Sequence, residues 1–167
     1  MILWVCQQLT VKGGTDAIVE YFGPGCASLS CTGKATICNM GAEHGATTSI
    51  FPFDSRMATY LKATGRTKLA ALAVQNAALL AADAEAERHF DRVLELNLSV
   101  LEPFVTGPHS PDRARPISKL KEEAAREGFP ERITAALIGS YTNSAYEDIM
   151  RAVDVARQAK AAGLRAV

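Results

Sequence analysis

The stretch SCTGKATICNMGAEHGATTSIFPFDS, Ser30 to Ser55, carries the signals that decide the fold class. Its first half repeats small residues at helical spacing, which is typical of a helix that packs closely on a sheet. The run Ala46–Phe53 is rich in β-branched and aromatic residues, and Pro52 marks the end of the predicted strand. Asp54 or Ser55 can then cap a further helix. Helix, strand and helix in succession predict an α/β architecture.

The same alternation continues on both sides of this stretch. Toward the N-terminus we expect a helix at 2–9, a glycine-containing turn at 12–15 and a strand at 17–21. Toward the C-terminus we expect a helix at 68–88, a strand at 89–100, a helix at 119–128, a strand at 132–140, a helix at 145–162 and the start of a strand at 164–167. The pattern predicts a three-layer α/β/α fold with mainly parallel sheets.

One segment interrupts the alternation. Residues 102–116, EPFVTGPHSPDRARP, contain four prolines and one glycine, a composition typical of a linker. We therefore place a linker at 105–116, between a first domain at 1–104 and the beginning of a second domain at 117–167.

Composition limits the classes of function. The chain has 167 residues, 48% hydrophobic and 22% charged, as expected of a folded globular protein. Its 18 basic and 18 acidic residues balance, so its net charge favours neither a nucleic acid nor an anionic membrane as a partner. Because no apolar run approaches the roughly 20 residues that span a bilayer, and the opening MILWVCQQL lacks the basic region of a signal peptide, we expect an intracellular soluble protein. Its compartment, mitochondrial or cytoplasmic, is left open by these features.

Four cysteines, Cys6, Cys26, Cys31 and Cys38, fall in the first quarter of the chain. Their spacings match neither a zinc ribbon nor a zinc finger, so we expect free thiols and no metal site. The adjacent segment GPGCAS has two glycines of a dinucleotide fingerprint but lacks the third. A simple glycine turn is the favoured interpretation, and a nucleotide-binding module is the alternative.

A candidate site follows the strand expected at 132–140. The loop SYTNS places Tyr141 where α/β proteins bind ligands, just before a helix that Ser144 and Glu147 would cap as a capping box. A helix start favours an anion or a thiolate, but a tyrosine offers only a phenol with a pKa near 10. The alternative is an aromatic residue that closes the top of a sheet.

A second candidate pair lies in the segment NMGAE. Asn39 and Glu43 are four residues apart and share one face of the expected helix, and the alternative is an ordinary solvated face. The three histidines, His44, His89 and His109, form no metal or acid–base motif, so we assign them no role and expect surface or boundary positions.

Three segments, taken together, resemble the aconitase family, and specifically its mitochondrial type. They are LTVKGGTDAIVEYFGPG from Leu9, SCTGKATICNMGAEHGATTSIFPFDSRMATYLKATGR from Ser30, and IGSYTNSAYED from Ile138 with its helix RAVDVARQAKAAGL. The SAYED continuation is similar to aconitases rather than to isopropylmalate dehydratases. The resemblance implies two incomplete aconitase-like domains.

The resemblance also implies an activity. The intact family is a hydro-lyase that interconverts citrate and isocitrate through cis-aconitate, with a 4Fe-4S cluster whose free iron acts as a Lewis acid on the substrate. In the family pattern Asn39 and Glu43 point toward the cluster and the reacting hydroxyl, as active-site residues.

One position departs from the family pattern. The first cluster ligand of the family is the cysteine of G-S-C-T-N-S, and here Tyr141 occupies it. The remaining ligands, the substrate-binding arginines and the catalytic serine would lie beyond Val167, and the family's histidine and aspartate motifs before Met1. We therefore expect an isolated chain that binds no cluster and is inactive. The alternative is a non-enzymatic module that associates with itself or with a fuller homologue.

Overall fold

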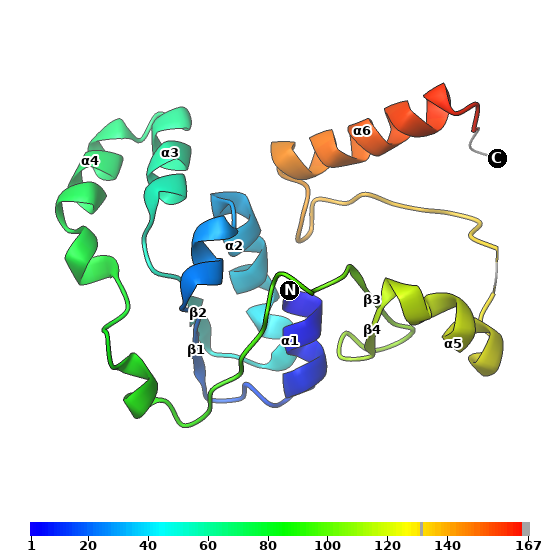
Figure 1. Cartoon of the computed structure of the whole chain (residues 1–167), viewed down its shortest axis with the longest axis horizontal. Helices are drawn as coiled ribbons and strands as arrows, with labels where there is room; N and C mark the ends of the chain where they lie inside the picture. The colour runs from blue at the N-terminus through cyan, green and yellow to red at the C-terminus, as the bar shows by residue number, and fades with distance from the viewer. Residues whose placement is uncertain (131, 165–167) are drawn as a thin grey trace. The chain divides into compact units, whose positions relative to one another are not determined.

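The computed structural model describes residues 1–130 and 132–164, which divide into a first unit, Met1–Phe129, and a second unit, Pro130–Val167. The first unit contains the helices α1 (Ile2–Leu9), α2 (Cys31–Asn39), α3 (Ser55–Ala63), α4 (Thr67–Gln75) and α5 (Leu120–Glu127), and the strands β1 (Ile18–Glu20), β2 (Thr48–Ile50), β3 (Phe104–Thr106) and β4 (Ala114–Pro116) (Figure 1). Its 3-10 helices are η1 (Pro24–Ser28), η2 (Met40–His44), η3 (Ala77–Leu80), η4 (Ala86–His89) and η5 (Ile117–Lys119). The second unit contains α6 (Tyr146–Ala161). None of the described helices is both long and apolar enough to cross a membrane.

A parallel strand pair joined through α2 confirms the α/β fold class. β1 pairs in parallel with β2, with Val19 opposite Ser49, and Tyr21 N–H extends the pairing by donating to Ile50 O at 2.9 Å. Tyr21 and Phe51 stack at the end of this pair, with ring centroids 4.5 Å apart. The apolar face of α1 packs beside these two rings and completes the core. The buried core residues are Ile2, Val5, Cys6, Leu9, Tyr21, Cys26 and Ile37.

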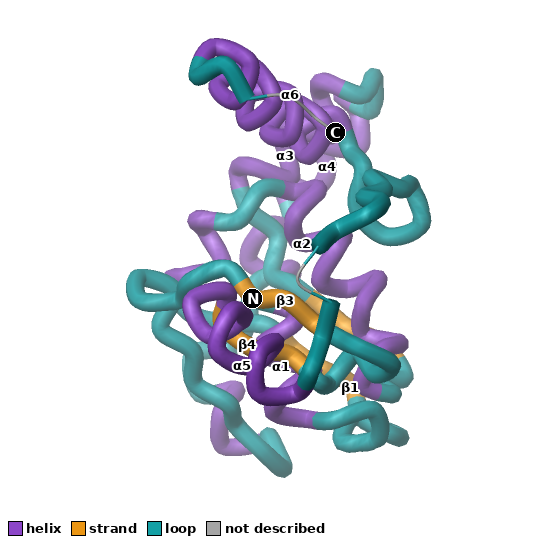
Figure 2. The backbone as a smooth tube through the Cα atoms, turned by 90° about the vertical axis from the view of Figure 1, so that its right-hand side faces the viewer, coloured by secondary structure: helices purple, strands orange, loops and turns teal. Residues whose placement is uncertain are grey.

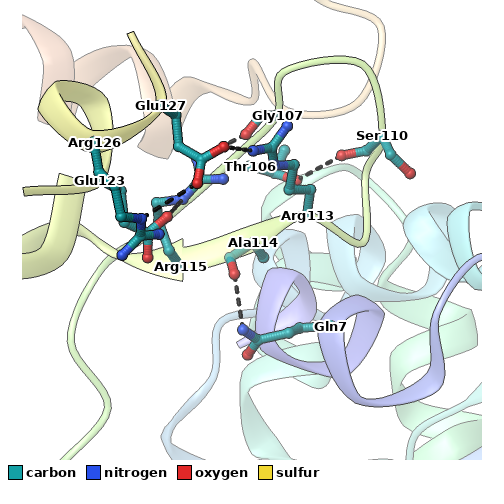
Figure 3. Close-up of polar contacts among 10 residues, drawn as sticks. All are labelled: Gln7, Thr106, Gly107, Ser110, Arg113, Ala114, Arg115, Glu123, Arg126 and Glu127. Carbon is teal, nitrogen blue, oxygen red and sulfur yellow. Dashed lines mark hydrogen bonds and ion pairs between the residues drawn. The ribbon is translucent and has the colours of Figure 1, made fainter. Parts of the chain in front are cut away.

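The proline-rich segment forms a hairpin. β3 and β4 pair antiparallel, with Val105 opposite Arg115, and α1 packs on the pair (Figure 2). Gln7 Nε2 donates to Ala114 O at 2.8 Å, so a side chain of α1 satisfies one backbone carbonyl of the hairpin (Figure 3). The limits of the family domains, 1–104 and 117–167, stay a prediction.

A buried arginine ties α5 to this hairpin. Arg115 is only 5% exposed, and its guanidinium donates to Glu123 Oε2 and, at 2.7 Å, to Gly107 O (Figure 3). Arg113 pairs with Glu127 at 3.0 Å, and both guanidinium groups lie over the ring of Phe129. A guanidinium group that donates to two different acceptors and also lies over an aromatic ring suits arginine rather than lysine.

A buried lysine joins α2 to the start of α3. Lys34 is 2% exposed and its ammonium group pairs with the Asp54 carboxylate, while Asp54 Oδ1 accepts from Met57 N–H at 2.9 Å. The predicted cap is therefore confirmed, and it is also an ion pair. Burial would raise the pKa of Asp54, but the hydrogen bonds from Lys34 and Met57 outweigh it and hold that pKa below its ordinary value.

Three predicted elements are wrong in part or in whole. The helix expected at 68–88 ends at Gln75 and continues only as 3-10 turns. The strands expected at 89–100 and 132–140 are absent from the described residues, which there lie in irregular backbone. Strands need hydrogen-bond partners from distant segments, so alternating apolar residues alone cannot form them. The strand start expected at 164–167 falls largely on residues 165–167, which lie outside the described residues.

The helix expected at 145–162 is confirmed as α6, but its cap is shifted by one residue. The carboxylate that caps the helix start belongs to Asp148 and not to Glu147. Asp148 Oδ2 accepts a hydrogen bond at 3.1 Å from the backbone N–H of Ala145, the residue just before the helix. Gly163 follows the helix with φ of 75°, as its predicted role as a stop signal requires.

We expect Lys34→Met to lower the free energy of unfolding of this chain by about 3 kcal/mol, because it leaves the largely buried Asp54 carboxylate without its cation. Denaturant unfolding followed by circular dichroism measures the change. Lys119→Met is the matched control, since its pair with Glu122 at 3.9 Å is exposed and worth little. Equal effects of the two substitutions would contradict the structural role of Lys34.

Candidate functional site

The candidate pair Asn39 and Glu43 lies at the end of α2 and in η2. Asn39 is the last residue of α2 and is exposed, while Glu43 is half-buried. The helix tightens between them: a 3-10 helix has about three residues per turn, so residues four apart are less well aligned than in an α-helix. The shared α-helical face expected from the sequence is therefore replaced by a helix end followed by a tighter turn.

Small residues let η2 approach its neighbours closely. A Cβ atom on the buried Gly41 would lie 2.8 Å from Ser49 Oγ of β2. Gly45 ends η2 with φ of 84°, a left-handed conformation that favours glycine. The small-residue stripe predicted for this segment is confirmed at Gly41, whereas Ala42 is exposed.

The buried stripe of this segment contains two titratable residues that were not predicted to lie in the core. Lys34 and Ile37 of α2 and Gly41 and His44 of η2 are buried, at spacings of three, four and three residues. Those spacings are the helical signal that could have revealed the stripe. It was missed because Lys and His are seldom core residues.

His44 is wholly buried, which corrects its expected surface or boundary position. Its exposed fraction is 0%, and neither Nδ1 nor Nε2 has a hydrogen-bond partner among the described residues. Its backbone carbonyl accepts from Gly14 N–H at 2.8 Å. Burial lowers the pKa of His44, an effect that contact with its own backbone opposes only in part. His89 and His109 are exposed, as expected.

Glu43 acts electrostatically on the core thiol of α1. Burial raises the pKa of Cys6 to about 11, and the negative charges of Glu43 and Asp112 add to that shift. Asp112 is held nearby, since its carboxylate accepts from Val11 N–H at 3.3 Å. The Glu43 carboxylate therefore lies near the inner face of α1.

Tyr141 lies in the second unit and is 91% exposed. The strand expected before it is absent from the described backbone, so Tyr141 does not close the top of a sheet. Its alternative interpretation as a structural aromatic residue is therefore wrong. The helix expected after its loop is present as α6, five residues on.

The cysteines are not grouped for metal binding. All four are free, and among the described residues no three His, Cys, Asp or Glu side chains are placed to hold a metal ion. Burial raises the pKa of each thiol, which favours the protonated form over the thiolate that ligates metals.

We expect Cys6 to be alkylated last of the four thiols at pH 8. A pKa of about 11 in place of 9.0 reduces its thiolate fraction about a hundredfold, and burial slows it further. Timed iodoacetamide labelling with peptide mass spectrometry gives the order, and the half-buried Cys38 serves as the internal reference. Labelling of Cys6 at the rate of Cys38 would show that α1 does not bury it.

Comparison with known proteins gives one consistent result. The model of the aconitase family (aconitate hydratase) matches residues 1–167. The chain is 56% identical over 165 residues to the mitochondrial aconitate hydratase of Gracilaria gracilis and 54% identical over 165 residues to that of Schizosaccharomyces pombe. It is 55% identical over 166 residues to that of Aspergillus fumigatus.

Each of these matches covers 99% of this chain but 21% of the relative. The chain therefore spans about a fifth of the length of the curated relatives it matches. Because the family model extends over every residue and the identity exceeds one half, the chain belongs to the aconitase family.

Proposed function

We propose that this chain is a segment of an aconitate hydratase, a hydro-lyase that interconverts citrate and isocitrate through cis-aconitate in the tricarboxylic acid cycle. The observation that supports this proposal most strongly is the sequence identity: over 99% of its length the chain is 54–56% identical to proteins that bear this name. Those relatives are called mitochondrial, which supports a mitochondrial location for the intact enzyme.

Within this proposal Asn39 and Glu43 are the chain's contribution to the active site. The exposed amide of Asn39 can donate and accept hydrogen bonds with a hydroxyl or carboxylate of the substrate. The half-buried Glu43 carboxylate, held at the glycine-lined end of η2, can accept a proton or a hydrogen bond from the reacting hydroxyl. Both residues lie in the first unit, so their positions do not depend on α6, which belongs to the second unit.

The residues present do not fit a 4Fe-4S cluster. Such clusters are held by cysteine thiolates, and Tyr141 offers a phenol at the family's ligand position. Of the four cysteines in the first unit two are buried and two half-buried, and burial raises the pKa of each. We infer that the isolated chain binds no cluster and does not hydrate cis-aconitate, and that it behaves as a pseudoenzyme.

A second candidate function is association, favoured by one exposed apolar segment. Ile133, Leu137 and Ile138 are 81%, 92% and 60% exposed, in backbone that forms no strand. Unpaired N–H and C=O groups beside apolar side chains invite pairing with another chain. The partner would be a second copy or a fuller homologue.

A segment exchange tests the enzymatic proposal. Residues 1–167 replace the matching segment of the Schizosaccharomyces pombe enzyme, and cluster content and aconitate hydration are measured after anaerobic reconstitution. We expect neither cluster nor activity with Tyr141, and both with Tyr141→Cys, because the substitution restores a thiolate. Adding Glu43→Gln to the active chimera should lower turnover about a hundredfold without loss of cluster.

Glu95→Gln is the matched control, since Glu95 is exposed and outside the candidate site. An active chimera that tolerates Glu43→Gln would remove Glu43 from the site. A cluster in the Tyr141 chimera would overturn the ligand assignment.

The association candidate is tested by sedimentation of the isolated chain over a range of concentrations. We expect the sedimentation coefficient to rise with concentration, and Leu137→Asp to abolish the rise by placing a charge in the apolar segment. Val100→Asp, at a site that is 79% exposed in the first unit, should leave it unchanged. A monomer at all concentrations would exclude self-association.

A further inference from the structure

His44 is the buried titratable side chain that the proposed function does not use. Its ring is 0% exposed, and neither ring nitrogen makes a hydrogen bond to a described residue. A neutral imidazole in this position leaves one N–H donor unpaired, and a protonated one would leave two donors and a charge unpaired. The site therefore tolerates the neutral form far better than the charged form.

The contacts of His44 join two segments that are distant in the sequence. Its carbonyl oxygen accepts from Gly14 N–H at 2.8 Å, and a Cβ atom on Gly14 would lie 2.7 Å from His44 Nδ1. The turn at 12–15 thus rests directly on the ring and backbone of His44. Thr15 and Ala46, which lies just after η2, form an isolated antiparallel β-bridge across the same junction.

Among the described residues, none supplies a charge that shifts the pKa of His44. η2 packs against α1, α2 and β2 as well as the turn. The titratable side chains on these elements and at the turn, besides His44, are Cys6 of α1, Lys12 of the turn and Asp16 just after it, Cys31, Lys34 and Cys38 of α2, and Glu43 of η2 itself. None of them contributes to the lowered pKa of His44, which comes from burial.

We propose that His44 is a pH-sensitive latch, whose neutral ring holds η2 on the turn at 12–15 and whose protonation releases that contact. η2 carries Glu43, so release of the latch frees the segment that bears a candidate site residue. The latch depends only on contacts within the first unit and not on the proposed enzymatic function.

The sign of the pH dependence follows from the direction of the shift. The folded-state pKa of His44 lies below its ordinary value of 6.5, so the open state binds the proton more tightly. The closed latch is fully stable above pH 6.5 and loses stability as the pH falls from 6.5 toward the folded-state pKa. Over that interval a single titrating group changes an opening constant up to about tenfold per pH unit.

Hydrogen exchange measures the opening directly. The Gly14 N–H reports on the latch because it donates to His44 O, and the Gly107 N–H, which donates to Arg113 O at 3.1 Å in the hairpin, is the reference amide. After correction for intrinsic exchange, we expect the Gly14 opening constant to rise up to about tenfold per pH unit below 6.5. The Gly107 opening constant should rise much less.

Histidine variants separate His44 from the other titrating groups. His44→Leu should remove the pH dependence at Gly14, while His89→Gln and His109→Gln, at exposed sites, should preserve it. If His44→Leu does not fold, NMR titration of the imidazole in the wild-type chain replaces it. A ring that titrates near 6.5 while Gly14 stays protected, or an unchanged pH dependence in His44→Leu, would overturn the proposal.

Discussion

The close approach of η2 to its neighbours is the constraint on which the first unit depends. Gly14 and Gly41 have no side chain, so the turn at 12–15 can lie on His44 and η2 can lie on Ser49 of β2. A Cβ atom at either glycine would lie within 3 Å of atoms across the junction, well inside contact distance. The placement of Glu43 therefore rests on two glycines that take no part in any chemistry.

Buried cations supply polar links between other elements of the first unit. Lys34 joins α2 to the cap of α3, and Arg115 joins the hairpin of β3 and β4 to α5. Each is more than nine-tenths buried and each has a carboxylate partner, as the cost of burying a charge requires. Two short strand pairs are marginal by themselves, so these ion pairs and the apolar face of α1 stabilise elements that could not persist alone.

Family membership and the local chemistry give different answers about function. The chain retains the segment with Asn39 and Glu43 in a folded first unit, consistent with an aconitate hydratase segment. Tyr141, which we propose to stand at the family's ligand position, is exposed in a described segment without a strand. Iron–sulfur clusters are held by cysteine thiolates, and this is the chemical reason for our proposal that the isolated chain binds no cluster.

Sequence alone determined the features that depend on neighbouring residues. The helices α1, α5 and α6, the Asp54 cap and the Gly163 stop were predictable because helical hydrogen bonds and caps join residues that are close in the chain. The resemblance to the aconitase family was also readable in the sequence, from the order of three motifs.

Tertiary structure alone decided the features that need distant partners. It left 89–100 and 132–140 without strands among the described residues, and it paired the proline-rich segment as a hairpin. It also placed Lys34 and His44 in the core, because burial of a titratable group depends on which segments close over it.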